Sequence, residues 1–464
     1  MGWRVVAIGV VVAGCGRLHF DPLGDGGNTG DDGPATLGPG TMVSASNGEA
    51  GDRLGRSVAV SGDGQTVAFG AWDEASSATG INGDETDNSA AGTGAVYVFR
   101  RNGFDWTQEA YIKPINANAG AHFAASVALS GDGNVLAVGA DLEDTTAANS
   151  GAAYIYRRNA GVWSTEAALK ASNPDATDHF GGAIALSRDG ATLAVGAADE
   201  DSAGIETDNS ALSAGAVYIF TFAGSWTQQA YIKPSNINAG DLFGTSVALS
   251  VDGSVLAVGA TAETAGAGAA YVFTRSGTSW MQSAYIKASN AEANDSFGDS
   301  VALSDDGGTL AVAAVFESSA GRGIDADQTD NSAGNSGAVY VFTNTGTWTQ
   351  QVYIKSSNSD ASDAFGIWIA LSSDGSTLAV SANGEDSAAT GLDGDQLDNS
   401  ASGAGAAYVL TRSGTLWSQR TYVKATDTAA GARFGVRLGL SGAGDVLAVG
   451  ADFARAQIGS GYIY

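Results

Sequence analysis

Hydrophobic and polar positions along this chain alternate with a period of two in several short segments. Residues 300–304 alternate in this way and lead through an Asp-Gly dipeptide, typical of a hairpin turn, into the apolar segment 309–314. A loop of variable length separates these two predicted strands from a third at 337–342, and a further turn leads into a fourth at 348–355. The pattern predicts four short antiparallel strands per unit, without the 3.6-residue period of an amphipathic helix.

This four-stranded unit occurs seven times along the chain. Each copy carries an aromatic residue or leucine followed by a small residue, and these anchors are Leu54, Phe123, Phe180, Phe243, Phe297, Phe365 and Phe434. The anchors lie 54 to 69 residues apart, and a predicted outer strand begins 12 residues before each of them. Only the loops vary in length, as expected for a repeated supersecondary unit whose insertions are confined to surface turns.

Seven four-stranded units predict an all-β fold, a seven-bladed β-propeller. The second strand of each unit consists of small and branched apolar residues, as at 256–260, which indicates burial on both faces near the axis. The last unit ends after its third strand, and residues 41–46 supply the missing fourth strand from the other end of the array. Pairing of the two ends would close the ring without a free strand edge. A solenoid is the structural alternative, but its ends would not need to match.

The first residues of the chain predict a secretory signal. Residues 1–14 hold one positive charge and an apolar run too short to span a bilayer, and small residues precede Cys15, the only cysteine. This pattern resembles a bacterial lipobox, in which cleavage before the cysteine leaves its thiol to carry a lipid; an ordinary signal peptide is the alternative. Residues 15–40 are rich in Asp, Gly and Pro and predict a flexible tether ahead of the propeller at 41–464. By the same resemblance, Gly16 implies the outer membrane or the cell surface.

The net charge of the chain argues against some classes of binding partner. The 464 residues have a formal net charge of −28, with 50 acidic side chains against 22 Lys and Arg. A surface of this sign repels nucleic acid and anionic lipid, and it favours solubility and the attraction of cations. We therefore expect a monomer with no nucleic-acid partner, whose fold depends on packing because no disulfide can form within the chain.

The step Phe297-Gly298, the segment 258–260 and the strand 337–342 together resemble the FG-GAP repeat of integrin α-subunit propellers and their bacterial lipoprotein relatives. The resemblance covers about residues 41–464 and implies a propeller that binds a partner. In integrin-like repeats the loop between the first two strands often carries a calcium-binding motif. Here that loop is reduced to turns such as 61–64, and one carboxylate per turn cannot supply the six to eight oxygens of a calcium site.

Carboxylates gather instead in the loop between the second and third strands, where four units carry long insertions. Oxygen ligands at every second or third position of a glycine-containing loop could wrap a hard cation such as Ca²⁺. The candidate ligands are Asn82, Asp84, Asp87, Asp325, Asp327, Asp330, Asp393, Asp395 and Asp398. The alternative is that these side chains cap tight turns through hydrogen bonds to the backbone.

Strand direction assigns the loops to two faces. In an antiparallel blade, the loops between strands two and three share a face with the loops between blades, and the hairpins lie on the opposite face. We therefore expect the acidic insertions to share a ligand-binding face with Asp178, Asp241, Asp295 and Asp363. The outer hairpins place arginines on the other face, namely Arg100, Arg101, Arg157, Arg158, Arg275 and Arg412. A tether that enters at Thr41 from the arginine face would hold that face toward the membrane.

Three other residue types recur at equivalent positions of the units. Tryptophans near the start of the predicted outer strands could form a sugar-stacking ring, but packing between blades is the role we expect for Trp106, Trp163, Trp226, Trp280, Trp348 and Trp417. The lysine of each Tyr-Ile-Lys step is expected to face solvent. His122 and His179 occupy one repeat position, and no nucleophile elbow, phosphate loop or histidine cluster accompanies them.

The leading hypothesis is a non-catalytic, lipid-anchored envelope protein that binds or adheres to a partner protein or a glycan through its propeller. One alternative is a propeller hydrolase or lyase that uses carboxylates on one face, although no acid–base pair differs from its copies in other repeats. A structural component of the envelope is the other. The fold itself hosts many functions, so the site must decide between them.

Overall fold

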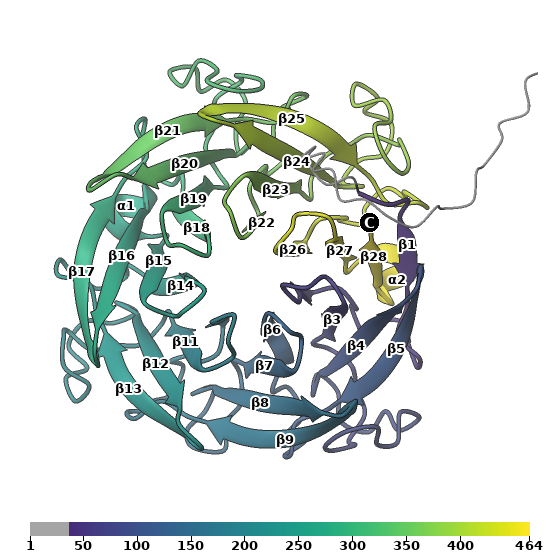
Figure 1. The fold of residues 1–464 in the computed structure, drawn as a ribbon, viewed down its shortest axis with the longest axis vertical. Helices are drawn as coiled ribbons and strands as arrows, with labels where there is room; N and C mark the ends of the chain where they lie inside the picture. The colour runs from purple at the N-terminus through teal and green to yellow at the C-terminus, as the bar shows by residue number, and fades with distance from the viewer. Residues whose placement is uncertain (1–36) are drawn as a thin grey trace, which may run out of the picture. The chain divides into compact units, whose positions relative to one another are not determined.

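Each repeated unit of the sequence forms one four-stranded antiparallel sheet, and seven sheets surround a central axis (Figure 1). The structure is a computed structural model that describes residues 37–464. It confirms the seven-bladed β-propeller predicted from the repeats. The predicted signal at 1–14, the lipidation site Cys15 and most of the predicted tether lie outside the described residues.

The strands are given blade by blade, from the axis outward. Blades one to three consist of β2 (Ser57–Val60), β3 (Thr66–Ala71), β4 (Ala95–Asn102) and β5 (Asp105–Ile112); β6 (Phe123–Leu129), β7 (Val135–Ala140), β8 (Ala152–Asn159) and β9 (Val162–Leu169); and β10 (Ala183–Leu186), β11 (Thr192–Ala197), β12 (Ala216–Phe222) and β13 (Trp226–Ile232). Blades four to six consist of β14 (Phe243–Leu249), β15 (Val255–Ala260), β16 (Ala269–Ser276) and β17 (Ser279–Ile286); β18 (Phe297–Leu303), β19 (Thr309–Ala314), β20 (Ala338–Asn344) and β21 (Trp348–Ile354); and β22 (Ile369–Leu371), β23 (Thr377–Ala382), β24 (Ala406–Ser413) and β25 (Leu416–Val423).

The seventh blade joins the two ends of the described chain. It consists of β26 (Arg437–Leu440), β27 (Leu447–Ala451), β28 (Ser460–Ile463) and β1 (Thr41–Val43). Strand β1 pairs antiparallel with β28, with Thr41 opposite Ile463 and Val43 opposite Gly461, and Figure 1 shows the two strands side by side. The predicted closure of the ring by its terminal strands is therefore confirmed, and it leaves no open edge at the joint.

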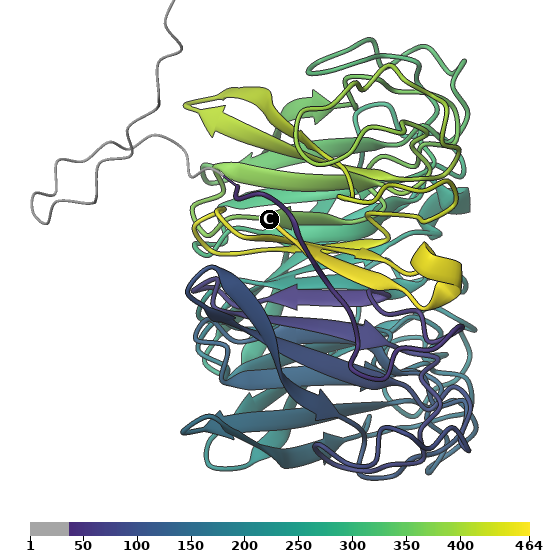
Figure 2. The same ribbon diagram turned by 90° about the vertical axis from the view of Figure 1, so that its right-hand side faces the viewer.

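Two helical turns, α1 (Glu263–Gly266) and α2 (Ala454–Gln457), take the place of the long insertions in blades four and seven. Their central residues have left-handed dihedral angles, so neither is a regular helix. None of the helices in residues 37–464 is long and apolar enough to cross a membrane. Figure 2 shows α2 and the long loops at one end of the ring and strand hairpins at the other.

The aromatic-glycine steps fit neighbouring blades against one another. Phe297 packs edge-on against Tyr340 and Phe342 of its own blade, with ring centroids 5.4 and 6.1 Å apart. Gly298 follows with a φ of +98°, and a Cβ on it would lie 2.4 Å from the carbonyl oxygen of Ala269 in the preceding blade. Only glycine tolerates this conformation and this close approach without strain. The repeated Phe-Gly step therefore sets the spacing between blades.

Backbone hydrogen bonds close one end of the central channel. The turns between the first and second strands of the seven blades bond to one another in a ring, from Asp63 N to Gly131 O and onward to Gly442 N to Gly62 O. The side chain of Arg188 lies across this end and bonds Asp305 and Ser373 of distant blades. A Cβ on Gly442 would come within 1.8 Å of the guanidinium of Arg188, so glycine makes room for it.

The recurrent tryptophans pack between blades, as predicted. Trp163 of blade two is 6% exposed and belongs to a core cluster with residues of blade one, and its Nε1 donates to Glu109 on the outer strand of blade one. Trp417 repeats the contact with Gln351 of the preceding blade. These indoles are therefore part of the core between blades.

The expectation that the Tyr-Ile-Lys lysines face solvent is wrong. Lys113, Lys355 and Lys424 are 0 to 2% exposed, and each pairs with a buried glutamate from the loop between strands two and three of its own blade. The same pair occurs in six blades, and in the seventh Ser44 and Ala454 stand at the two positions. The reason is that this loop folds over the outer strand and buries the side chains beneath it.

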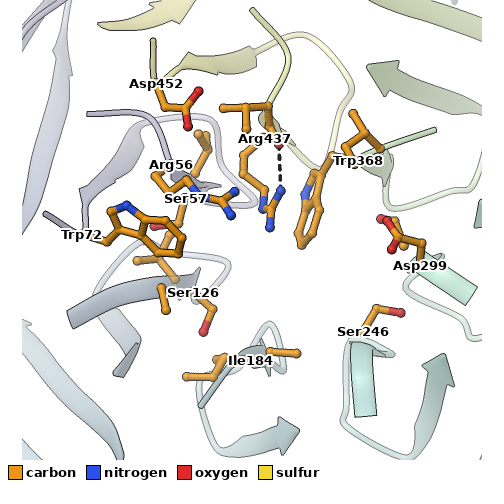
Figure 3. A pocket seen from close by; sticks show the side chains of 18 of the residues that line it. Arg56, Ser57, Trp72, Ser126, Ile184, Ser246, Asp299, Trp368, Arg437 and Asp452 are labelled. Atoms are coloured by element: carbon orange, nitrogen blue, oxygen red, sulfur yellow. Dashed lines mark hydrogen bonds between the residues drawn. The ribbon is translucent and has the colours of Figure 1, made fainter. Parts of the chain in front are cut away.

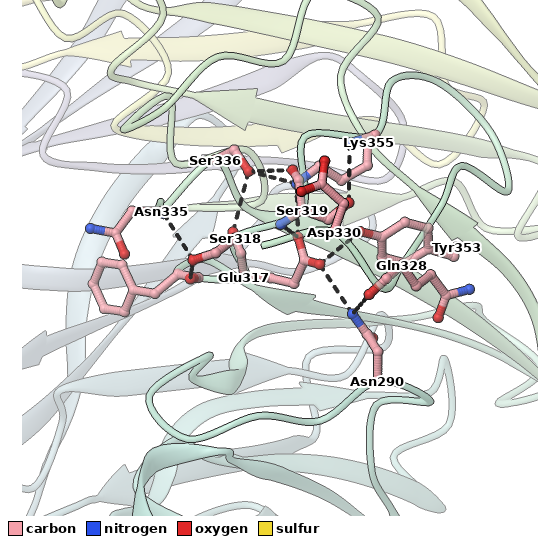
Figure 4. Close-up of polar contacts among 12 residues, drawn as sticks. Asn290, Glu317, Ser318, Ser319, Gln328, Asp330, Asn335, Ser336, Tyr353 and Lys355 are labelled. Carbon is pink, nitrogen blue, oxygen red and sulfur yellow. Dashed lines mark hydrogen bonds and ion pairs between the residues drawn. The ribbon is translucent and has the colours of Figure 1, made fainter. Parts of the chain in front are cut away.

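A network around each glutamate links neighbouring blades (Figure 4). In blade five, Glu317 accepts hydrogen bonds from Lys355 Nζ at 2.8 Å, Tyr353 Oη at 2.9 Å and Asn290 Nδ2 at 3.0 Å. Asn290 belongs to the loop from blade four, and its Oδ1 accepts from Tyr340 of blade five. A buried charge is tolerated only when it is paired and hydrogen-bonded, and this network meets both conditions.

Candidate functional site

The first candidate residue of three predicted metal loops protects a strand edge. Asp325 has a φ of +50°, donates its backbone N–H to the carbonyl oxygen of Tyr353, and accepts the backbone N–H of Tyr353 at 3.2 Å through Oδ1. Asn82 and Asp393 make the same pair of contacts with Tyr111 and Tyr422. The residues just before them, Ile81, Ile324 and Leu392, each form one antiparallel bridge with the outer strand of blade one, five or six. These loops therefore cover edges that could otherwise pair with another chain.

The other six candidates cap turns. Asp327 Oδ1 accepts the backbone N–H and the hydroxyl of Thr329, and Asp330 Oδ1 accepts the backbone N–H of Ser332. The equivalent contacts are made by Asp84, Asp87, Asp395 and Asp398. Hydrogen bonds lower the pKa of Asp84, Asp87, Asp327 and Asp398.

These contacts support the turn-capping interpretation of the insertions. Among residues 37–464, no group of three or more His, Cys, Asp or Glu side chains is arranged to hold a metal ion. Calcium binding by the insertions stays a prediction. The fold needs the same carboxylates as acceptors for backbone N–H groups.

The four aspartates predicted for the ligand face do not lie on the surface. Asp178, Asp241, Asp295 and Asp363 are 1 to 6% exposed, and each accepts the backbone N–H of the residue three positions earlier. Burial raises the pKa of Asp178 and Asp363 to about 7 and that of Asp295 to about 6, and it raises the pKa of Asp241. The loops between blades turn inward here, so these carboxylates bond within the loop and are not exposed on its surface.

Replacing Asp363 with asparagine should flatten the pH dependence of stability. The folded protein keeps this proton to about pH 7, whereas the carboxyl of an unfolded chain loses it near 3.8, so the stabilisation from protonation is complete in acid and is lost as pH rises through about 7. Thermal and denaturant unfolding should show Asp363→Asn gaining about 1–3 kcal/mol relative to the parent between about pH 5 and pH 8. Asp327→Asn is the control, because that carboxyl titrates below this range. Parallel stability curves for Asp363→Asn and the parent would contradict the prediction.

The open end of the channel holds a site that the sequence did not point out. A cavity of about 410 Å³ lies where the innermost strands begin, at the end of the axis that also carries the acidic insertions. We call it the mouth. It is lined by four arginines, two tryptophans, two aspartates and a ring of small residues at the starts of the inner strands. Figure 3 shows these side chains around an open centre.

Two arginines of the mouth are stacked on indole rings. The guanidinium of Arg56 lies 4.2 Å from the ring centroid of Trp72, and that of Arg437 lies 4.2 Å from Trp368. Figure 3 shows both guanidinium groups between the two indoles. His122 stacks on Trp72 with centroids 4.8 Å apart. Stacking fixes the planes of the guanidinium groups and leaves their N–H edges available for hydrogen bonds.

The arginines of the mouth carry more charge than their neighbours neutralise. Arg53 pairs with Asp73 at 3.4 Å, but within residues 37–464 Arg56, Arg433 and Arg437 form no ion pair with a carboxylate closer than 4.0 Å. Burial, followed by the positive charge of Arg56, lowers the pKa of Arg437 to about 9, and burial also lowers the pKa of Arg56. Neither guanidinium group forms a close ion pair within residues 37–464, and Asp452 acts on both of them only at longer range.

Two aspartates line the same cavity. Asp452 is 2% exposed beside the arginines, its Oδ1 has no hydrogen-bond partner in the described chain, and burial raises its pKa. Burial raises the pKa of Asp299 to about 6. Four arginines against two aspartates leave the lining positive in a chain of net charge −28. The mouth is a cationic patch on an acidic protein.

Two arginines on the opposite face, Arg157 and Arg158, differ from those of the mouth. Arg158 lies over Trp163 at 5.4 Å but also forms an ion pair with Glu109 at 2.8 Å, and Arg157 pairs with Glu166. Their positive charges are met by neighbouring carboxylates. Of the arginines that stack on tryptophan, Arg56 and Arg437 are the pair that meets inside one cavity.

A left-handed residue precedes every anchor, and two of these residues, Arg53 and Arg433, line the mouth. The seven residues have φ between +51° and +60°, and they are Arg53, His122, His179, Leu242, Ser296, Ala364 and Arg433. Non-glycine residues adopt this conformation rarely, and it is often found at binding sites. Four consecutive copies around the ring are basic: Arg433, Arg53, His122 and His179. A hydrogen bond to Asp199 raises the pKa of His179.

A comparison of the seven copies in the sequence marks two residues of the site. The third residue after the anchor is serine in blades one, two, four and five and alanine in blade three, but it is Trp368 in blade six and Arg437 in blade seven. Ser57, Ser126 and Ser246 donate their hydroxyls to carbonyl oxygens of the next blade. Blades six and seven give up this contact, so their large side chains signal a function other than packing.

The comparisons with known proteins agree with this architecture. Four segments match the FG-GAP repeat family, at residues 106–156, 163–220, 226–273 and 280–342. Each match begins on the outer strand of one blade and ends in the third strand of the next. The repeats and the seven blades together define the class of this protein, a β-propeller with FG-GAP repeats, and this fold is consistent with protein binding.

Solved structures support the fold alone. A chain in the "Crystal Structure of Mitotic Checkpoint Complex" superposes with a TM-score of 0.52 at 13% sequence identity, covering 94% of this chain and 96% of that one. At this identity the similarity shows a shared architecture and no shared activity. No curated protein matches the sequence.

Proposed function

We propose that this chain is a non-catalytic, lipid-anchored protein of the bacterial envelope that binds a partner protein at the mouth of its propeller. The observation that carries the proposal is the pair Arg56 and Arg437, which are stacked on indoles, form no ion pair within 4.0 Å in the described chain and line an open cavity. Holding two like charges together costs stability, and such strain is retained where a ligand relieves it.

The direction of the chain supports an outward-facing mouth. Strand β1 is the outer strand of blade seven, and its beginning at Thr41 lies at the hairpin end of the ring. A lipid on Cys15 would hold that end toward the membrane and present the mouth and the acidic insertions to the surroundings. Attachment at the outer membrane or cell surface rests on the lipobox resemblance and belongs to the same proposal.

Filling the mouth should abolish partner capture. Ile184 lines the cavity, and Ile184→Trp should fill much of it without changing an arginine. The immobilised parent ectodomain should retain a protein from native envelope extracts that Ile184→Trp loses by at least about tenfold. The control is Ser276→Trp, which places the same side chain at an exposed hairpin on the opposite face. Equal capture by the parent and Ile184→Trp, measured by quantitative mass spectrometry, would refute binding at the mouth.

A propeller hydrolase or lyase is the second candidate, and Asp299 is the observation in its favour. Its pKa of about 6 suits a general acid or base at neutral pH, and it lines the same cavity. Turnover of a glycan or polymer that disappears in Asp299→Asn would replace the binding proposal with the enzymatic one. A structural envelope role would leave mouth variants and the parent alike in both assays.

A further inference from the structure

We infer that the group recognised by the mouth is a carboxylate on a short carbon chain, held between the guanidinium groups of Arg56 and Arg437. The inference rests on the proposed function, for which it specifies the group that the partner inserts. The carboxylate can come from an acidic side chain or a chain terminus of a partner protein, or from a free organic acid. The structure supports this chemistry in three ways.

The first support is the arrangement of the hydrogen-bond donors. Each guanidinium has one face on an indole, at 4.2 Å in both cases, so its N–H edge is the part left for a ligand. The one hydrogen bond that Arg437 donates within the described chain goes to the backbone oxygen of Val436. A planar fork of N–H donors matches a planar carboxylate with two parallel hydrogen bonds.

The second support is the shape and polarity of the cavity. Below the arginines, its wall is formed by branched apolar side chains of the inner strands, namely Val58, Val127, Ile184, Val247 and Val301. These five side chains can contact methylene groups. The lining also contains hydroxyl groups, of which those of Ser57, Ser126 and Ser246 already donate to backbone carbonyl oxygens. A volume of about 410 Å³ holds an acidic side chain and its backbone, or a small dicarboxylic acid.

The third support is the charge balance. Asp299 and Asp452 reduce the positive charge of the four arginines, and the whole chain is strongly acidic. A carboxylate brings one negative charge to the arginine pair and is repelled less by Asp299 and Asp452 than phosphate, which brings up to two charges to the same point. The lining therefore favours a carboxylate over phosphate.

Calorimetric titration of the ectodomain tests the inference with four probes. Glutarate and N-acetylglutamate carry the carboxylate, glutaramide is the neutral isostere of glutarate, and inorganic phosphate is the competing oxyanion. At least one carboxylate should bind, and glutaramide should not. Arg437→Met should weaken binding by about 10- to 100-fold, and Arg437→Lys, which keeps the charge but not the fork, should fall between. Arg275→Met, on the opposite face, should bind as the parent does.

Stability separates a ligand-binding arginine from a structural one. Arg437→Met removes one of two adjacent positive charges, so its melting temperature without ligand should equal or exceed that of the parent. A structural role predicts a lower melting temperature. The inference is overturned if neither carboxylate binds at about 10 mM, if phosphate binds as tightly, or if Arg437→Met binds as the parent does.

The experiments distinguish failure of partner binding at the mouth from failure of carboxylate recognition. If Ile184→Trp loses the captured protein but no carboxylate binds the parent, binding at the mouth stands and the carboxylate inference falls. If the small acids bind and do not displace a mouth-dependent partner, the ligand is a free acid. If they displace it, the partner inserts a carboxylate into the same site.

Discussion

Replacing Lys355 with methionine should destabilise the propeller by about 3–5 kcal/mol, because it leaves the buried carboxylate of Glu317 without its cation. Lys355 is 2% exposed, and its Nζ also donates to Ser336 at 2.7 Å. The remaining partners of Glu317 are Tyr353, Asn290 and the backbone N–H of Ser319, which are neutral and cannot balance its charge. Denaturant unfolding monitored by tryptophan fluorescence measures the loss.

Two matched variants give this prediction its control. The double variant Lys355→Met/Glu317→Gln removes both charges and should recover most of the lost stability, since a buried ion pair adds little beyond a neutral pair of similar volume. Lys287→Met should cost less, because the Lys287 side chain is 24% exposed and water can reach Glu263 in its place. A loss for Lys355→Met no larger than that for Lys287→Met would show that the pair is not a buried unit.

Deleting residues 41–47 should open the ring and reduce stability by about 5 kcal/mol. The deletion removes the pairing of β1 with β28 and the buried side chain of Val43. It also removes Asn47, whose amide donates to Glu74 of blade one and whose oxygen accepts from Tyr97. The exposed edge of β28 should then recruit other chains.

Light scattering after size exclusion, together with denaturant unfolding, measures both effects of this deletion. The full ectodomain should be monomeric, and the shortened one should form oligomers at the same concentration. Adding a peptide of residues 41–47 should reduce the oligomers, because it can pair with β28. If the shortened protein remains a monomer with the unfolding curve of the parent, closure by β1 does not stabilise the ring.

Much of the architecture could be predicted from local features of the sequence. The Phe-Gly step recurs because the tight approach between blades requires an aromatic residue to fill the gap and a glycine to adopt positive φ, as at Phe297 and Gly298. The continuous run of small apolar residues in each second strand indicated that this strand is buried. The two ends of the repeat array indicated that the ring closes, because the last repeat lacks a fourth strand and the segment beginning at Thr41 supplies it. These are nearest-neighbour and pattern effects that a linear sequence contains.

The direction of the Tyr-Ile-Lys lysines could not be read from alternation alone. Alternation separates the two faces of an outer strand but does not say what covers either one. In the structure the loop between the second and third strands folds over this strand and brings Glu317 to Lys355 and Glu74 to Lys113. The packing of that loop on the outer strand is a tertiary contact. It buries lysines that the sequence pattern had predicted to be exposed.

The role of the acidic loops could not be predicted from the sequence pattern alone either. A spacing of two or three residues between oxygen-bearing side chains suits a cation site and a series of capped turns equally well, because both require oxygens directed inward. The backbone decides between them by offering its own N–H groups as donors, as Thr329 does to Asp327. The aspartates of the loops between blades were likewise predicted to be exposed because they are charged. They are buried, as Asp363 is, because these loops turn inward.

By itself, the sequence of this protein determined seven blades, their four strands and the joint between the chain ends, because these depend on short-range geometry repeated along the chain. The mouth depends on contacts between segments that are distant in the sequence. Arg56 and Arg437 are far apart in sequence, and closure of the ring by β1 and β28 makes their blades neighbours. Their stacking on Trp72 and Trp368 then places two unpaired positive charges in one cavity. No local pattern encodes that meeting, because it arises from the closing of the ring.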